Sequence, residues 1–488
     1  MCLVKAFLLF GFFVSCTVSV AKNTATQDAI IPSPPFKSVT TQHRININNT
    51  VLSYHATVGV MPISDQKNLP IATMSYIAYF ADTANNNRPI TFIWAGGPGC
   101  SSLSDNFLMS GPRVIDLNSG RTQPGLVDNP ETWLQWTDLV YIDMVGSGWG
   151  RSNKNAAKTV FTPIGDAYTF SNFIENYLQQ HGRLHSPIYL SGESYGGFRV
   201  PLVVNNLLKQ FIPVKGIILL SPLLDSVYQA SHFGDNTPYP LIIPTFIRTA
   251  LYFHKLPPAL QNNPEKTIRD GSQWAAAQYP YYLLRGDSLN NEEKTKLVIT
   301  LSQYTGLSES VIRDNHFRIS SAIFRRSLLS NIDKSLDLID SRNAQHTLHK
   351  DYGFYVFNIG SFMSSQLILY PNAMNYISQD LGVKVTKNYI NYADPNQLGW
   401  NGVDTTQVIS ILHDNLVINP KMWVFVGMGF YDTDVPYFAT ETAINQLLLP
   451  DPLQKNITLH HYAGGHMFYV DPAVKQPFFN DIKTFFSK

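Results

Sequence analysis

The first half of the chain alternates between short apolar runs and stretches in which apolar residues recur at helical spacing. The apolar runs, which predict buried strands, lie at residues 73–80, 89–95, 138–143, 187–191 and 214–220. Helical spacing is found over residues 164–178 and 200–208, each stretch lying between two of these runs. This part of the chain therefore predicts strands connected by amphipathic helices.

The same order returns towards the end of the chain. Strands are predicted at residues 422–429 and 457–463, with a helix through Phe438 and Leu447 between them and a final helix that reaches Phe486. Alternation of this kind gives a largely parallel central sheet with helices on both faces. We therefore expect an α/β fold.

The region between the two alternating parts has a different pattern. It is rich in proline, tyrosine and asparagine, and it contains helical fragments but few strand-like runs. We expect a large, mainly helical insertion that forms a lid. The predicted organisation is a core at residues 22–220 and 396–488, interrupted by the insertion at 221–395 and preceded by a separate segment at 1–21.

Composition excludes two broad classes of protein. The 488 residues are 44% hydrophobic and only 15% charged, which argues against a disordered chain. Lys and Arg together number 36 against 35 for Asp and Glu, so there is no basic surplus to bind a phosphate backbone. We therefore expect a globular protein without a nucleic-acid partner.

The first 21 residues have the layout of a secretory signal peptide. Lys5 precedes an apolar run at residues 6–14, and small residues up to Ala21 offer a cleavage site. The run is shorter than the roughly 20 residues that span a bilayer. A lipoprotein anchor at Cys16 is a less favoured alternative, because Phe13 stands where an aliphatic residue is usual.

Signal removal changes what the mature chain contains. Cys2 and Cys16 would leave with the signal, so Cys100 would be the only cysteine and no internal disulfide could form. No later stretch reaches about 18 consecutive apolar residues, so we expect no integral membrane segment after signal removal. These features predict an exported protein, periplasmic or secreted.

A nucleophile motif stands between a predicted strand and a predicted helix. The sequence GESYGG at residues 192–197 contains the pattern G-x-S-x-G, centred on Ser194. A serine on a strained strand-to-helix turn needs glycines around it because the backbone is crowded there. The position of the motif between a predicted strand and a predicted helix, more than the residue pattern itself, indicates a catalytic serine.

A catalytic serine needs a base, and the base needs an acid to orient it. Asp432 follows the predicted strand at 422–429, and His466 follows the next one, so both lie at the same sheet edge as the serine. Asp434 is an alternative acid. His460 and His461 are alternative bases, although both fall inside the predicted strand.

The glycine-dense loop AGGPGCSS at residues 95–102 follows another predicted strand. Such a loop can present backbone N–H groups to the oxyanion that forms during acyl transfer. A phosphate-binding loop is excluded because no Lys followed by Ser or Thr comes after the glycines. Histidine pairs lack supporting carboxylates at metal-site spacing, so we expect neither a metal nor another cofactor.

Four segments together resemble the serine carboxypeptidase family, a branch of the α/β-hydrolases. They are WAGGPGCSS, GESYGG, GFYDTDVP and YAGGHMFY, with weaker similarity in YIDMVGSGWGRS and GIILLSPLLDS between them. The resemblance extends over about residues 91–469 and is much better in the core than in the insertion. It implies an α/β-hydrolase fold for the sheet predicted above.

The resemblance also implies a role for each motif residue. Ser194 would be the nucleophile, His466 the base and Asp432 the orienting acid. The backbone N–H groups of Gly97 and Tyr195 would form the oxyanion hole.

On the substrate side, the resemblance implies that Glu193 is protonated and binds the terminal carboxylate of the substrate, with Gly96 also at the substrate site. This arrangement is physically reasonable, since one carboxyl group can bind another only when they share a proton.

Two positions depart from the family pattern. The family places an asparagine at Ala95 and a second glutamate at Met109, so two side chains that read a free C-terminus are missing. One hydrogen bond to a charged group contributes roughly 1.5–3 kcal/mol, which corresponds to about 10- to 100-fold in preference. Cys100 matches a cysteine that is disulfide-bonded in many members, and its lack of a partner points to a bacterial-type member.

These observations leave three hypotheses for function. The leading one is an exported serine carboxypeptidase that hydrolyses C-terminal peptide bonds of peptides or proteins through an acyl-enzyme. The second is an esterase, amidase or acyltransferase on the same scaffold, because the carboxylate reader is incomplete. The third is a binding protein without catalysis, against which the complete set of serine, acid, base and oxyanion loop argues.

Overall fold

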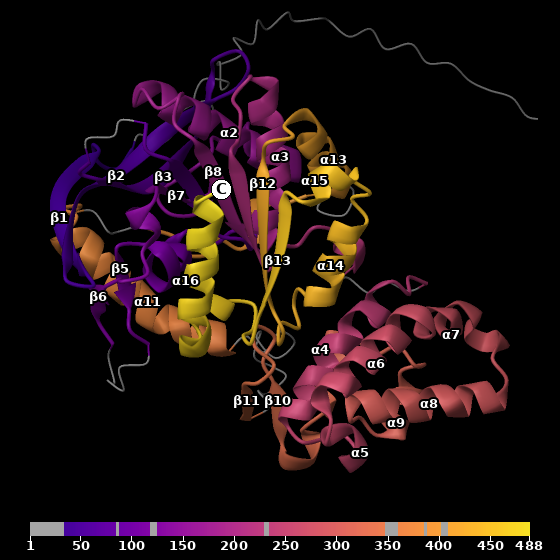
Figure 1. The fold of residues 1–488 in the computed structure, drawn as a ribbon. Coiled ribbons are helices and arrows are strands. Elements are labelled where there is room, and N and C mark those ends of the chain that lie inside the picture. Colours follow the sequence, from indigo (N-terminus) through magenta and orange to yellow (C-terminus); the bar gives the residue numbers. More distant parts are fainter. Residues whose placement is uncertain are drawn as a thin grey trace, which may run out of the picture.

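The computed structural model describes residues 34–83, 87–117, 124–228, 234–346, 360–384, 388–401 and 408–488. Its centre is a nine-stranded sheet with the strand order β1-β2-β3-β7-β4-β8-β9-β12-β13 (Figure 1). The strands are β1 (Val39–Ile47), β2 (Thr50–Ser64), β3 (Pro70–Ala81), β4 (Ile90–Trp94), β7 (Asp138–Ile142), β8 (Ile188–Glu193), β9 (Gly216–Leu220), β12 (Trp423–Gly429) and β13 (Ile457–Tyr462).

The sheet combines an antiparallel edge with a parallel centre. β1, β2, β3 and β7 pair antiparallel in that order, whereas every pairing from β7 through to β13 is parallel. The parallel strands occupy the positions that the apolar runs predict. The predicted α/β class with a largely parallel central sheet is confirmed.

The long β1–β2 hairpin has no counterpart among the predicted strands. Its loop consists of Asn48 and Asn49, with φ values of 46° and 69°, between the paired residues Ile47 and Thr50. Two residues in the left-handed region form the tight hairpin turn that suits the twist of antiparallel strands. β2 buries only part of its residues, so its pattern is weaker than the continuous apolar runs of the parallel strands.

Two hydrophobic clusters cover the two faces of the sheet. Because successive side chains of a strand point to opposite faces, Met74 and Tyr76 of β3 contribute to one cluster, and Ile77 and Tyr79 contribute to the other. The helices that cover the first face are α2 (Pro163–Gln180), α3 (Tyr195–Lys209), α13 (Val408–Ile418) and α14 (Tyr437–Asn445). The second face is covered by α11 (Gly360–Gln379) and α16 (Pro472–Phe486).

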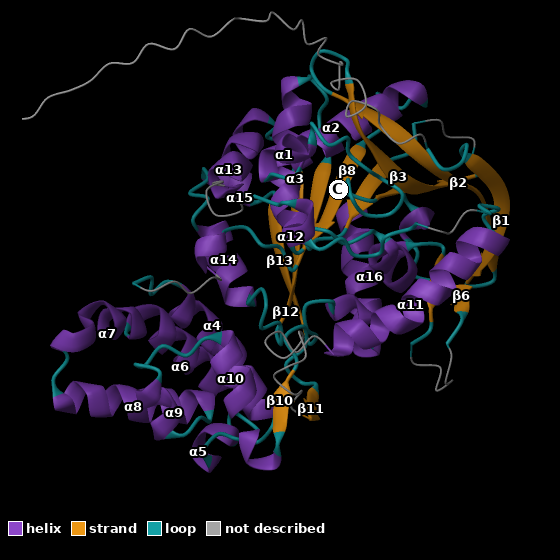
Figure 2. Cartoon of the chain, turned by 180° about the vertical axis from the view of Figure 1, so that it is seen from behind, coloured by secondary structure: helices purple, strands orange, loops and turns teal. Residues whose placement is uncertain are grey.

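A separate helical lobe stands beside the sheet domain (Figures 1 and 2). Its elements are α4 (Pro238–Tyr252), α5 (Pro258–Gln261), α6 (Pro264–Ala277), α7 (Tyr279–Arg285), α8 (Asn291–Thr305), α9 (Glu309–Asp314), α10 (Ser321–Ser327) and the short strands β10 (Lys334–Leu336) and β11 (Ala344–His346). The lobe has a hydrophobic core of its own, in which the rings of Phe246 and Phe324 stack with centroids 3.9 Å apart. Helix α4 packs against α14 and so attaches the lobe to the sheet domain.

The last part of the predicted insertion lies with the sheet and not with this lobe. Leu369 and Ile377 of α11 are fully buried in the same cluster as Ile45 of β1. The hydroxyls of Tyr54 on β2 and Tyr376 on α11 are 3.4 Å apart. Helix α11 therefore covers the antiparallel edge of the sheet.

Short elements complete the part of the chain that the structure describes. They are β5 (Arg113–Ile115), β6 (Leu126–Asp128), α1 (Ala157–Val160), α12 (Pro395–Leu398) and α15 (Asp451–Gln454). Across these described ranges no helix is both long and apolar enough to cross a membrane. The predicted signal peptide at residues 1–21 lies outside the described residues.

Candidate active site

Ser194 occupies a strained turn between a strand and a helix. Strand β8 ends at Glu193 and helix α3 begins at Tyr195, so Ser194 alone connects them, with φ 57° and ψ −125°. A non-glycine residue in such a conformation costs about 1–3 kcal/mol, and this strain is typical of functional sites. The backbone N–H of Ser194 donates to the carbonyl oxygen of Leu220 at the end of β9 (2.9 Å), which fixes the turn.

The glycine loop lies directly against this turn. A Cβ placed on Gly96 would come within 2.7 Å of Ser194 Cβ and 2.9 Å of the Tyr195 nitrogen, so only glycine fits at this position. Tyr195 is the first residue of α3, where backbone N–H groups are free of helical partners and the helix dipole favours negative charge. The structure thus brings the glycine loop next to the Tyr195 N–H, and an oxyanion hole formed by Gly97 and Tyr195 stays a prediction.

Two buried charges hold these two segments together. Arg199 on α3 donates from Nη1 to the carbonyl oxygen of Ala95 (3.0 Å) and from Nε to Oδ2 of Asp166 on α2 (2.6 Å). The Tyr195 hydroxyl also donates to Asp166 Oδ2 (3.3 Å), and Arg199 and Asp166 are almost fully buried. Sequence reasoning missed this pair, because its members lie on two different helices and form no motif.

His466 and Asp432 form a close, buried polar pair. Nδ1 of His466 lies 2.6 Å from Oδ2 of Asp432, which is fully buried. The other carboxylate oxygen, Oδ1, accepts hydrogen bonds from the backbone N–H groups of Asp434 (2.9 Å) and Val435 (2.8 Å). Burial by itself lowers the pKa of His466, but the facing carboxylate of Asp432 outweighs this effect and raises the pKa above its usual value.

The alternative acid and bases have other contacts. Asp434 approaches Asp432 through its backbone and not through its carboxylate. His460 contacts Asp481 (3.2 Å) and His461 contacts Glu441 (2.7 Å), so both are side chains with partners of their own on β13. The geometry therefore brings together the residues that the sequence favours.

The end of strand β9 connects the serine turn to the histidine loop. Leu220 accepts the hydrogen bond from the Ser194 N–H, and the hydroxyl of the next residue, Ser221, donates to the carbonyl oxygen of His466 (2.8 Å). The charge of His466 is also close enough to lower the pKa of Glu193, which precedes the serine. The Ser194 turn and the loops that carry His466 and Asp432 consequently lie along the carboxyl edge of the parallel strands, where α/β sheets bind ligands.

A segment at the base of the helical lobe supports the histidine and aspartate loops. The His466 N–H donates to the carbonyl oxygen of Ile339 (2.6 Å), and the Thr433 hydroxyl donates to that of Leu338 (2.8 Å). Arg342 donates to the carbonyl oxygen of Ala463 (2.7 Å), at the start of the histidine loop. These contacts were not predicted, because the sequence of the insertion carries no motif.

Glu193 is buried beside the serine and has the properties of a group that stays protonated in mildly acidic solution. Its exposed fraction is 5%, and its Oε2 accepts a hydrogen bond from the Tyr469 hydroxyl (2.9 Å). Burial raises the pKa of Glu193 to about 7, although the charge of His466 and the Tyr469 hydrogen bond act in the opposite direction. Tyr469 was missed as a site residue, even though it ends the motif YAGGHMFY.

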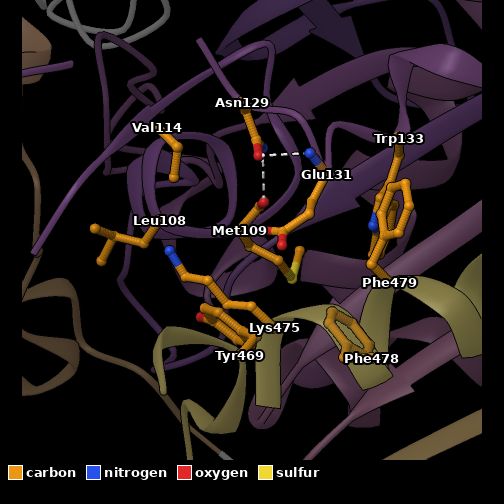
Figure 3. Close-up of a pocket in the computed structure, with 10 residues that line it drawn as sticks. All are labelled: Leu108, Met109, Val114, Asn129, Glu131, Trp133, Tyr469, Lys475, Phe478 and Phe479. Carbon is orange, nitrogen blue, oxygen red and sulfur yellow. Dashed lines mark hydrogen bonds between the residues drawn. The ribbon is translucent and has the colours of Figure 1, made fainter. Parts of the chain in front are cut away.

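The two departures from the family pattern are both buried. Ala95 and Met109 are each 7% exposed, and neither side chain can donate a hydrogen bond to a carboxylate. Met109 lines a pocket that is also bounded by the ring of Tyr469 and by Phe478 of α16 (Figure 3). None of Ser194, Asp432 and His466 lines this pocket, so it is not the cleft in which a reacting bond would lie.

Within the part of the chain that the structure describes, no group of three or more His, Cys, Asp and Glu side chains is arranged to hold a metal ion. Cys100 is a free thiol, and burial raises its pKa to about 12, so it stays in the unreactive thiol form.

Comparison with known proteins identifies the family. The profile described as serine carboxypeptidase matches residues 57–466 of this chain. The chain belongs to the serine carboxypeptidase family. The resemblance found in the sequence is thereby confirmed, whereas membership of a bacterial-type branch stays a prediction.

Individual relatives match this family member over shorter segments. Serine carboxypeptidase-like 4 of Arabidopsis thaliana is 29% identical over 32% of this chain and 37% of its own length. The pheromone-processing carboxypeptidase KEX1 of Yarrowia lipolytica is 30% identical over 32% of this chain and 24% of its own length. The matched segments thus span only about a quarter to 37% of these curated relatives.

A solved structure supports the fold along most of the chain. The prohormone-processing carboxypeptidase Kex1(Δ)p of Saccharomyces cerevisiae superposes with a TM-score of 0.57 at 17% identity, covering 89% of this chain and 91% of that one. At this identity the similarity establishes the shared fold and leaves the activity to be argued from the site.

Proposed function

We propose that this protein is an exported serine carboxypeptidase, which hydrolyses the C-terminal peptide bond of its substrates through an acyl-enzyme on Ser194. The observation that carries the proposal is the convergence of the Ser194 turn with the His466–Asp432 pair at one sheet edge. Family membership supports the same reaction class.

The geometry supports a definite role for each group. His466 accepts the proton of the Ser194 hydroxyl through Nε2 as the oxygen attacks the scissile carbonyl, while Asp432 holds the proton on Nδ1 and stabilises the imidazolium. The N–H groups of Gly97 and Tyr195 stabilise the negative oxygen of the tetrahedral intermediate. His466 then gives its proton to the departing amine. In the second stage, His466 takes a proton from water as the water oxygen attacks the ester carbonyl, and it returns this proton to the Ser194 oxygen as the ester bond breaks.

Glu193 gives the reaction its expected preference for acidic solution. Below its pKa of about 7 the side chain carries a proton and can donate a hydrogen bond to the terminal carboxylate of a peptide. Above this pH the two groups repel each other. We therefore expect binding of free C-termini to weaken as the pH rises through neutrality.

A second candidate function is favoured by two specific positions. Ala95 and Met109 remove two groups that the family uses to read a free C-terminus. An esterase, amidase or acyltransferase would use the same serine, base and oxyanion donors without needing that recognition.

One experiment decides between the two functions. The purified protein is given benzyloxycarbonyl-Phe-Leu with a free carboxylate and the same dipeptide as its amide, from pH 4 to 8, with Ser194→Ala as the inactive control. Preference for the free acid that fades with rising pH supports the carboxypeptidase. Equal cleavage of both, or turnover of simple esters alone, contradicts it and supports the alternative.

Export is the part of the proposal that rests on the sequence of the first 21 residues. Sequencing the amino terminus of the mature protein tests it, with cleavage after Ala21 as the expected result. A chain that retains Met1, or one that carries lipid on Cys16, contradicts cleavage at this position.

A further inference from the structure

Glu193 has a second buried carboxyl group for a neighbour. Asp105 is the first residue of η2 (Asp105–Ser110), a π-helical turn that packs against η7 (Phe468–Val470), the element that contains Tyr469. Asp105 is 1% exposed and Glu193 is 5% exposed. The helical turn therefore places a buried carboxyl group on an element that packs against the element of Tyr469, the hydrogen-bond partner of Glu193.

Both carboxyl groups have an oxygen without a partner. Within the described residues, neither Oδ2 of Asp105 nor Oε1 of Glu193 has a hydrogen-bond partner, although both atoms are buried. Leaving a buried polar atom unpaired costs about 1–3 kcal/mol, and more for a charged group, so two such atoms together are unusual. Carboxyl oxygens left open in this way are available to a ligand that brings hydrogen-bonding atoms of its own.

The electrostatics of the pair suit a shared proton. Burial raises the pKa of both groups, and the charge of Glu193 raises that of Asp105 further, with a smaller contribution from Asp143. The nearby hydroxyl of Tyr469 stays protonated for the same reasons. The charge of His466 lowers the pKa of Glu193 without cancelling the effect of burial, and the buried guanidinium of Arg199 is hydrogen-bonded to Asp166 and to the carbonyl oxygen of Ala95.

Asp105 lies on the same helical turn as Met109, the position at which the family has a glutamate. Met109 lies four residues further along η2, and residues four apart on a helix lie close together on one side. Met109 shares a pocket with Tyr469, which is the hydrogen-bond partner of Glu193 (Figure 3). A carboxyl group at Asp105 can therefore act in the region that a glutamate at Met109 would otherwise reach.

We propose that Asp105 and Glu193 together bind the terminal carboxylate of the substrate, with Asp105 replacing the glutamate that the family places at Met109. This inference rests on the proposed function and identifies its substrate class as peptides with a free C-terminus. At acidic pH the protons of the two carboxyl groups lie towards the incoming carboxylate, which satisfies the two open oxygens. An amidated C-terminus brings no negative charge to this site and is bound less well.

The test compares three variants with the wild type in kinetics at pH 5. Asp105→Ala lowers the ratio of kcat/KM for benzyloxycarbonyl-Phe-Leu to that for its amide by about 10- to 100-fold, the effect of one lost hydrogen bond to a charged group. Adding Met109→Glu to Asp105→Ala returns a carboxyl group to the same helix and recovers at least ten-fold of that ratio. Met109→Leu, which only exchanges one apolar side chain for another, leaves the ratio within about two-fold.

Binding measured without turnover separates this inference from the proposed function. In the Ser194→Ala background, calorimetric titration with benzyloxycarbonyl-Phe-Leu and its amide gives the preference directly, and Asp105→Ala reduces that preference by the same 10- to 100-fold. If binding prefers the free acid but the wild type hydrolyses neither peptide, the proposed function fails and the role of Asp105 stands. If the preference persists in Asp105→Ala, or both ligands lose affinity equally, Asp105 is only structural and the inference is overturned.

Discussion

At the scale of single residues, the His466–Asp432 pair determines which nitrogen of the imidazole carries the proton. Asp432 uses one oxygen for the imidazole and the other for two backbone N–H groups, so both carboxylate oxygens are engaged. In Asp432→Asn, the amide N–H group donates a hydrogen bond to Nδ1 of His466. The imidazole then carries its own proton on Nε2, so Nε2 cannot accept the proton of the serine hydroxyl. We expect kcat to fall by about 10³- to 10⁴-fold. Steady-state kinetics of the folded variant measures this loss.

The matched control is Asp434→Asn, two residues away. Only the backbone of Asp434 contacts Asp432, and the Asp434 carboxylate acts on His466 through its charge alone. Its loss should change kcat by less than about ten-fold. A larger fall in kcat for Asp434→Asn than for Asp432→Asn would indicate that Asp434 is the catalytic acid.

Neutralising Glu193 should change both limbs of the pH profile of kcat/KM. The carboxylate of Glu193 raises the pKa of His466, as do Asp432 and Asp434, so Glu193→Gln removes one raising influence. The acidic limb, which reports the loss of the basic imidazole, should therefore shift to lower pH. The alkaline limb for free-acid substrates, set by ionisation of Glu193 near its pKa of about 7, should disappear because a glutamine does not titrate.

The measurement is kcat/KM against pH for a free-acid peptide and for its amide. The charged groups that act on His466 are Asp432, Asp434 and Glu193. Glu193 also lies near Tyr469 and Asp105. Tyr469→Phe is therefore the control, because it removes a hydrogen bond to Glu193 but keeps the carboxyl group. The Tyr469 hydrogen bond lowers the pKa of Glu193, so its loss should move the alkaline limb to higher pH. An alkaline limb unchanged in Glu193→Gln shows that another group limits activity there.

At the scale of secondary-structure elements, helices α2 and α3 are joined by a buried ion pair, and its arginine also contacts the glycine loop at Ala95. Removing Arg199 alone leaves the charge of Asp166 buried and unpaired, which costs about 3–5 kcal/mol in the free energy of unfolding. Replacing both by leucine removes the unpaired charge and should recover most of that stability. The carbonyl of Ala95 nevertheless loses its partner, so kcat should stay low in the double variant.

Urea unfolding and kcat, measured on Arg199→Leu and Arg199→Leu/Asp166→Leu, separate the two effects. Recovery of stability together with kcat would mean that Arg199 has a structural role only. Recovery of stability without kcat identifies Arg199 as a positioning residue for the oxyanion loop.

The elements also show which features can be predicted from the sequence. The parallel strands β4, β7, β8 and β9 are buried throughout and read as continuous apolar runs, and the serine turn carries its own glycine motif, so both were found. The β1–β2 hairpin was missed because half-buried strands alternate in character, although the Asn48–Asn49 pair is a turn signal that could have indicated it. Asp105 was missed because its electrostatic interaction with Glu193 joins segments far apart in the sequence, which no local pattern reveals.

At the scale of the whole molecule, the helical lobe is tied to the site at its base. Ile339 and Leu338 accept hydrogen bonds from the histidine and aspartate loops, and Arg342 pairs with Asp340 and with Asp471 at the start of α16. The lobe therefore contributes to the position of the loops that carry His466 and Asp432. This connection predicts that a change at the base of the lobe affects catalysis more than stability.

Arg342→Ala tests this coupling. Its ion pairs are partly exposed to solvent, so their loss should lower the free energy of unfolding by no more than about 1 kcal/mol. The loop that carries His466 loses the hydrogen bond at Ala463, and a small displacement of a catalytic group is costly, so we expect kcat to fall by about ten-fold. Arg313→Ala removes an exposed ion pair with Glu309 on the lobe and should leave kcat unchanged. Equal kcat in the two variants would show that the lobe base does not position His466.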